Sequence, residues 1–121
     1  MAKHMLRMKA AGSSLPASYR APVALWNFGE ALTLVALPAE PVAAYVPLLK
    51  SALPGRPLWI SGYNNDCFGY LPTAQVTREG GHEAIGVTLW LWGQHLANNA
   101  GFFAPEVEDR ILGCVKRLGA L

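Results

Sequence analysis

The amino-acid sequence predicts a small α/β unit of two or three layers, built from a β-hairpin, one βαβ crossover and a C-terminal helix. The chain has 121 residues, which suits one domain at about 150 residues per domain. Strand-like runs alternate with helix-like segments, as in parallel α/β units. Only 15% of the residues are charged and 52% are apolar, against roughly 25% charged in an ordinary soluble domain. Part of the apolar surface is therefore expected to meet another subunit, with a homodimer favoured.

The first twenty residues are expected to be a flexible start ahead of a single domain at 21–121. Residues 1–5 look like the remnant of an expression vector, so His4 is set aside as a candidate for chemistry. Arg7 and Lys9 stand where a secretory signal peptide has its apolar region, which argues against such a peptide.

The ordered part begins with two strand-like runs, at 21–28 and 31–37. The pair Gly29-Glu30 between them suits a type II′ hairpin turn, because glycine accepts a positive φ at the first central position. These runs predict an antiparallel hairpin.

A helix is expected to begin at Pro41, since proline suits the first helical position, where no amide hydrogen is needed. Its buried face has helical spacing and consists of Val42, Tyr45, Val46 and Leu49. Pro47 is expected to kink or shorten this helix. The compact apolar run 57–61 then predicts a strand covered on both faces. The order strand, helix, strand predicts one right-handed crossover with parallel strands.

The remaining chain predicts a long loop, a strand and a helix. Residues 62–81 are rich in Gly, Asn, Asp and Pro, and loops of that length are usually functional or disordered. Alternating side chains favour a strand at 85–96. Pro105 opens the clearest helix, with acidic residues in its first turn and basic residues in its last, as the helix dipole favours. Its buried stripe is Val107, Ile111, Val115 and Leu118.

Charge and cysteine content exclude several functional classes. Ten basic and eight acidic residues leave a net charge of +2, which is too small and scattered for a phosphate-binding stripe, so no nucleic-acid partner is expected. Cys67 and Cys114 form no C-x-x-C pair, so reduced thiols and a cytoplasmic location are expected, while one bridge stays open. Glu40, Lys50 and several prolines interrupt every apolar run, so no membrane span is expected.

Chemistry is expected outside the carboxyl ends of the parallel strands. Glu40 follows one predicted strand and the loop from Gly62 follows the next, and adjacent strands lie about 4.8 Å apart. A carboxylate and a loop can therefore converge on one spot. The alternative for Glu40 is an acidic residue that stabilises a helix start.

Four motifs in this order resemble a known family. They are L-P-A-E-P at 37–41, G-Y-N-N-D-x-x-G-Y-L-P-T at 62–73, G-G-H-E-A at 80–84 and F-A-P-E-V-E-D-R-I at 103–111. Together they resemble the C-terminal part of the catalytic domain of the neutral/alkaline (non-lysosomal) ceramidase family and its bacterial relatives. The resemblance covers roughly residues 21–118.

The resemblance implies a zinc site, because family members bind one catalytic zinc with two histidines, a glutamate and a tyrosine. Glu40 matches the glutamate and Tyr70 the tyrosine; the alternative for Tyr70 is an aromatic ring that packs under its loop. Such oxygen ligands suit Zn²⁺ at about 2.0 to 2.2 Å. His82 stands where the family has a further tyrosine that stabilises the oxyanion. An imidazole could keep that role or could itself be a metal ligand.

The sequence departs from the family because it has no counterpart of the family's two zinc histidines and active-site serine. The two zinc histidines and the active-site serine belong to a longer upstream segment, which nothing in residues 1–38 resembles, and a catalytic zinc normally has three protein ligands. Three outcomes stay open: a non-catalytic fragment, a domain that needs a complementary chain, or an oligomer that completes the site. His95 is interpreted as a surface or capping residue, and spacing lends no support to Cys67 with His82 as nucleophile and base.

The preferred function is a zinc-dependent hydrolase that cleaves an acyl or phosphoryl ester or amide bond of a small-molecule substrate through a metal-activated water. Glu40, Tyr70 and His82 are the candidate metal ligands. His82 is also the candidate oxyanion donor, and Asp66 or Glu83 the candidate proton acceptor. The alternative from another class is a non-catalytic fragment or assembly module.

Overall fold

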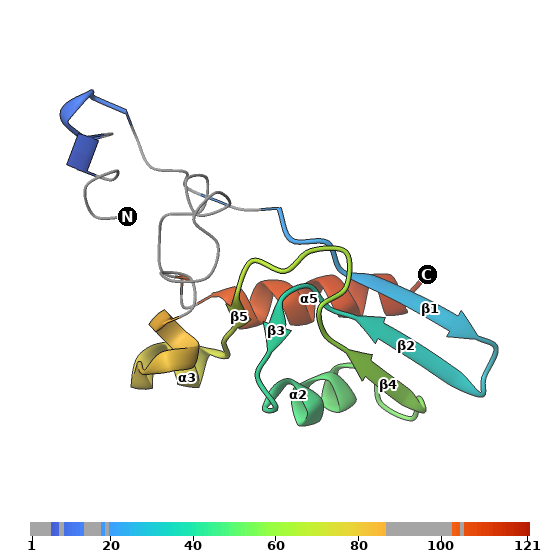
Figure 1. The fold of residues 1–121 in the computed structure, drawn as a ribbon. Helices are drawn as coiled ribbons and strands as arrows, with labels where there is room; N and C mark the ends of the chain where they lie inside the picture. Colours follow the sequence, from blue (N-terminus) through green and yellow to red (C-terminus); the bar gives the residue numbers. More distant parts are fainter. Residues whose placement is uncertain (1–5, 8, 14–17, 19, 87–102, 105) are drawn as a thin grey trace.

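A computed structural model describes residues 6–7, 9–13, 18, 20–86, 103–104 and 106–121 (Figure 1). Its ordered elements from residue 20 onward are five strands, two α-helices of eight or more residues, one shorter α-helix and a π-helical turn. Strands β1, β2 and β4 form one sheet in that order, and β3 pairs with β5 in a second, two-stranded sheet. The molecule therefore mixes helices and strands as an α/β unit does.

The predicted hairpin is present. Strand β1 (Ala24–Phe28) pairs antiparallel with β2 (Leu32–Ala36), and Phe28 is opposite Leu32. This register leaves residues 29–31 in the turn, so the predicted two-residue type II′ turn is wrong by one residue. Gly29 still has a positive φ of 59°, the backbone conformation for which glycine is preferred.

The predicted crossover is also present, because β4 (Leu58–Ser61) pairs parallel with β2 and α2 lies between them in sequence. The expectation that this strand is covered on both faces is wrong. In the described sheet β4 is an edge strand, and the side chain of Trp59 is 63% exposed. An apolar run therefore identified the strand but did not reveal its surroundings.

Helix α2 (Tyr45–Ala52) begins four residues later than predicted. Pro41 is not its first residue, because Glu40–Pro41 form β3 instead. The late start also removes the conflict over Pro47, which lies in the first turn, where no intrahelical partner for an amide hydrogen is needed. Val46, predicted on the buried face, is exposed.

The predicted loop at 62–81 contains two short elements. Strand β5 (Tyr70–Leu71) pairs parallel with β3, and α3 (Ala74–Glu79) follows it. The hydroxyl of Thr73 accepts a hydrogen bond from the amide of Val76 at 3.3 Å and so caps α3. The π-helical turn η1 (His82–Gly86) comes next. Of the strand expected at 85–96, the first two residues belong to η1, and residues 87–96 lie outside the described residues.

The C-terminal helix is confirmed as α5 (Val107–Gly119), with Glu108 and Asp109 in its first turn and Lys116 and Arg117 in its last. Ile111 and Val115 are buried, whereas Val107 and Leu118 are half-buried. Figure 1 shows α5 running behind the strands, with the chain's C-terminus beside β1.

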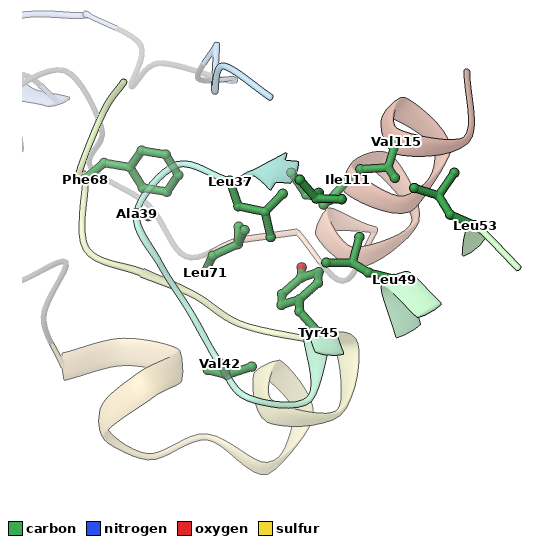
Figure 2. Packing of buried hydrophobic residues seen from close by; sticks show 11 residues of the cluster. Leu37, Ala39, Val42, Tyr45, Leu49, Leu53, Phe68, Leu71, Ile111 and Val115 are labelled. Carbon is green, nitrogen blue, oxygen red and sulfur yellow. The ribbon is translucent and has the colours of Figure 1, made fainter. Parts of the chain in front are cut away.

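The core packs α2 and α5 against one face of the β1, β2 and β4 sheet (Figure 2). Val35 of β2 is fully buried in the same cluster as Leu49 of α2 and Val115 of α5, with Leu25 and Ile60 packed against it. Leu37, Leu71 and Tyr45 continue the cluster toward the β3 and β5 ladder. The Tyr45 hydroxyl donates a hydrogen bond to the carbonyl oxygen of Pro72 at 3.1 Å. In the described part of the chain, α2 and α5 thus form a single layer against this sheet.

No helix among the described residues is both long and apolar enough to cross a lipid bilayer.

Candidate metal site at the β3 and β5 ladder

Glu40 and Tyr70 are opposite each other in the parallel ladder of β3 and β5. The amide of Glu40 donates to the carbonyl oxygen of Gly69 at 2.8 Å, and the amide of Val42 donates to that of Leu71 at 3.2 Å. Register partners in neighbouring strands project their side chains from the same face, with the strands about 4.8 Å apart. The carboxylate and the phenol therefore start from adjacent positions on one face.

Backbone hydrogen bonds bring the two strands together by folding the segment 61–69 against residues 37–40. The amide of Leu37 donates to Ser61 O at 2.9 Å, the amide of Tyr63 to Ala39 O at 2.6 Å, and the amide of Ala39 to Asp66 O at 2.8 Å. These bonds satisfy the main chain of both segments, as buried backbone requires.

The close approach also requires unusual backbone conformations. Ala39, Tyr63 and Asn65 have positive φ angles of 59°, 59° and 63°, which non-glycine residues rarely adopt and which cluster at functional sites. A Cβ on Gly62 would meet Pro41 Cδ at 2.6 Å. Only glycine therefore fits between the end of β4 and the proline of β3 without a shift.

The side chain of Asn64 holds the start of this segment. Its Nδ2 donates to the carbonyl oxygens of Gly62 and Ser61 at 2.7 and 2.8 Å, and its backbone amide donates to Leu37 O at 3.0 Å. Hydrogen bonds of this kind, from an Asn side chain to nearby backbone, stabilise turns. Asn64 thus stabilises the turn that follows β4 and holds this turn against Leu37.

Tyr63 contacts the candidate ligand Glu40 directly. Its phenol donates a hydrogen bond to the Glu40 carboxylate, and this bond, with smaller contributions from desolvation and from the nearby charge of Glu40, raises the pKa of Tyr63 to about 12. The Tyr63 side chain is otherwise exposed. A hydrogen bond to a carboxylate fixes its orientation, as partners of metal ligands commonly do.

His82 contacts the Tyr70 ring from the start of η1. Gly80 and Gly81, with φ angles of 77° and 93°, turn the chain between α3 and this residue. The imidazole lies edge-on to the Tyr70 ring, with 5.6 Å between ring centroids and an interplanar angle of 70°. His82 is exposed and Glu40 and Tyr70 are half-buried, so the three side chains are open to solvent.

The other predicted site residues, Asp66 and Glu83, lie in the segments that lead to Tyr70 and follow His82. Asp66 is half-buried in the segment before β5, where its carbonyl oxygen accepts the Ala39 amide. Glu83 is exposed in η1, directly after His82. Cys67 and Cys114 both have free, half-buried thiols. His95 lies outside the described residues.

The donor set of Glu40, Tyr70 and His82 fits zinc chemically, since a carboxylate oxygen, a phenolic oxygen and an imidazole nitrogen are all ligand types that Zn²⁺ accepts. No group of three His, Cys, Asp or Glu side chains able to hold a metal occurs within the described ranges. Of the three candidate ligands, only Glu40 and His82 belong to those four residue types, because the third is a tyrosine.

No protein-family model, curated protein or solved structure matches this chain. The ceramidase resemblance therefore stays a prediction that rests on the motifs at 37–41, 62–73, 80–84 and 103–111.

Reasoning from the sequence did not identify the roles of Tyr63 and Asn64. Both residues belong to the motif at 62–73. Nothing in the local sequence, however, links Tyr63 to the carboxylate of Glu40, 23 residues earlier. The two adjacent asparagines were the available signal, because Asn tolerates positive φ and bonds to nearby backbone. They indicate a tight turn but not the residue against which it closes.

Proposed function

We propose that this protein is a zinc-dependent hydrolase of an acyl or phosphoryl ester or amide bond in a small molecule, with Glu40, Tyr70 and His82 as the zinc ligands. The observation that supports this most is the register of β3 and β5, which sets Glu40 beside Tyr70. The contact of His82 with the Tyr70 ring adds a third donor from a separate segment. Three protein ligands are the usual number at a catalytic zinc.

When bound, Zn²⁺ supplies Lewis acidity that polarises the scissile oxygen and activates water. The protein's part is to hold the ligands and to move protons. Tyr63 donates to the Glu40 carboxylate and so limits its rotation. Glu83, exposed one residue after His82, is a candidate acceptor for a proton from the attacking water, and Asp66 is the other. An imidazole at position 82 that does not bind metal would instead donate to the developing oxyanion.

Elemental analysis of untagged protein tests the metal site. The expected result is about one zinc per chain or per pair of chains, lost in Glu40→Ala and in Tyr70→Phe. Glu30→Ala is a matched control, because Glu30 is an exposed glutamate in the turn between β1 and β2. Wild-type protein without zinc after loading, and without turnover of ester, amide or phosphoester probes, would end this proposal.

A non-catalytic assembly module is the second candidate function. It is favoured by the exposed side chains of Trp26, Phe28 and Trp59, since large exposed apolar patches mark sites of association. Light scattering and metal analysis on one sample separate the two functions. Self-associated protein without zinc supports the assembly module alone, and zinc with turnover supports the hydrolase.

A further inference from the structure

The sheet of β1, β2 and β4 has one face covered by α2 and α5, and an opposite face on which Trp26, Phe28 and Trp59 are exposed and Ala36 is buried. Leu25, Val35 and Ile60 are register partners across the three strands and pack in the core beneath α2 and α5. Side chains alternate between the faces of a strand. The neighbouring row of register partners, Trp26, Leu34 and Trp59, therefore points away from the helices.

This outer row is strongly exposed and apolar. Trp26 is 61% exposed and Trp59 is 63% exposed, on the two edge strands, while Leu34 between them is half-buried. Phe28 lies on the same face two residues after Trp26 and is 55% exposed. Every outward position of the three strands is uncharged; these positions are Ala24, Trp26, Phe28, Leu32, Leu34, Ala36, Trp59 and Ser61.

We infer that this outer face is the contact between two copies of the chain, packed sheet against sheet. Three aromatic side chains of about 200 Å² each, more than half exposed, offer roughly 350 Å² of apolar surface. A standard interface buries about 800 Å² on each partner. The aromatic residues thus supply close to half of one partner's share, and the leucines with the surrounding rim supply the rest.

A second copy fits this face better than a different partner does. The face has no charge for an acidic or basic protein to complement, and the only hydrogen-bonding groups of its exposed side chains are the indole N–H donors of Trp26 and Trp59. Apolar, charge-poor centres of this kind are typical of homodimer interfaces. The row also has the same residue type at both ends, because Trp26 and Trp59 flank Leu34. A twofold axis above Leu34 and parallel to the strands sets Trp26 of one copy against Trp59 of the other, which makes an isologous contact.

Analytical ultracentrifugation of the full chain over a range of concentrations tests the contact. Wild-type protein is expected to sediment as a dimer, and Trp26→Ser and Trp59→Ser are each expected to raise the dimer dissociation constant by at least about 30-fold, as for interface hot spots. Val46→Ser is the matched control, since it removes an exposed apolar side chain from α2, on the covered side of the sheet. Circular dichroism checks that each variant is folded.

Crosslinking distinguishes packing face to face from pairing of the edge strands. In a Cys67→Ser, Cys114→Ser background, Leu34→Cys is expected to give a crosslinked dimer with a bifunctional maleimide of about 10 Å, the spacing of packed sheets. Ser51→Cys, exposed on α2, is expected to give none. Crosslinking at Ser51 but not at Leu34 would overturn the proposed contact.

Association through this face requires no zinc, so the dimer is expected to persist in a metal chelator and in Glu40→Ala. Its presence or absence is therefore separate from the success of the hydrolase proposal. Wild-type protein that stays monomeric at about 100 μM would overturn the dimer. Binding of that monomer to phosphatidylcholine vesicles, lost in the Trp26→Ser and Trp59→Ser double variant, would assign the face to a lipid surface instead.

Discussion

Glu40 and Tyr70, thirty residues apart in the chain, are direct partners in the parallel ladder of β3 and β5. A two-residue ladder contributes few hydrogen bonds, and the surrounding segment supplies the rest through Leu37, Ala39 and Asn64. These backbone bonds fix the neighbouring positions from which the carboxylate and the phenol project. Such preorganisation is what a metal site requires of its ligands.

Replacing Tyr63 by phenylalanine tests the support of Glu40. The variant keeps the ring and loses only the hydrogen bond to the carboxylate. Partners of metal ligands typically contribute 10- to 100-fold in metal affinity, so zinc affinity is expected to fall by about that factor. Competition with a chromophoric chelator measures it. Tyr45→Phe is the control, because its hydroxyl binds Pro72 O and not Glu40; equal losses in the two variants would contradict the role of Tyr63.

Substitutions at His82 and Glu83 separate binding from proton transfer. If the imidazole is a ligand, His82→Gln lowers zinc affinity by more than about 10-fold. Glu83→Gln is expected to keep zinc and to lower kcat by about 10² to 10⁴, the usual contribution of a general base. Chelator competition and steady-state kinetics on the same samples give both quantities. A His82→Gln protein that keeps zinc and loses kcat would assign the imidazole to the oxyanion.

Replacing Gly62 by alanine is expected to destabilise the fold by about 1 to 3 kcal/mol, the usual cost of overpacking. The added Cβ would meet Pro41 Cδ at 2.6 Å, and the proline ring cannot rotate away. Gly119→Ala is the comparison, since its Cβ would meet the end of the Leu53 side chain, which can change rotamer. Urea unfolding measures both variants. A smaller loss for Gly62→Ala than for Gly119→Ala would contradict the close packing of β3 against the end of β4.

Tyr45 is expected to make the protein less stable in alkali. Burial, with a smaller contribution from the charge of Glu108, raises the pKa of its phenol well above the ordinary value of 10.0. Above pH 10 the unfolded chain therefore releases this proton while the folded chain keeps it. Stability from this group is full below pH 10 and is lost as the pH rises toward the folded pKa.

Tyr45→Phe checks this pH dependence. The variant is expected to lose about 1 kcal/mol at pH 7, because the hydrogen bond to Pro72 O is removed. Between pH 10 and pH 11 its stability is expected to fall less steeply than that of the wild type. Urea unfolding across this pH range gives both slopes, and identical slopes would show that Tyr45 does not titrate differently in the folded state.

The limits of sequence reasoning are clearest at Pro41. Taken locally, this proline suits a helix start, and the apolar spacing from Val42 onward also predicts helix. The helix begins only at Tyr45. The tertiary structure uses Glu40 and Pro41 as a strand, because residues 69–71 supply hydrogen-bond partners for the amides of Glu40 and Val42. A local sequence pattern gives no information about hydrogen-bond partners thirty residues away.

The sequence by itself determined the hairpin, the parallel crossover and the C-terminal helix, because each depends on turn residues and side-chain periodicity within a short stretch. Only the tertiary structure decided that Glu40 faces Tyr70, that Tyr63 contacts Glu40, and that Trp26 and Trp59 remain exposed. A period of two separates the faces of a strand without saying which one is covered. Which face is buried, and which loop closes on which strand, depends on how distant segments pack together.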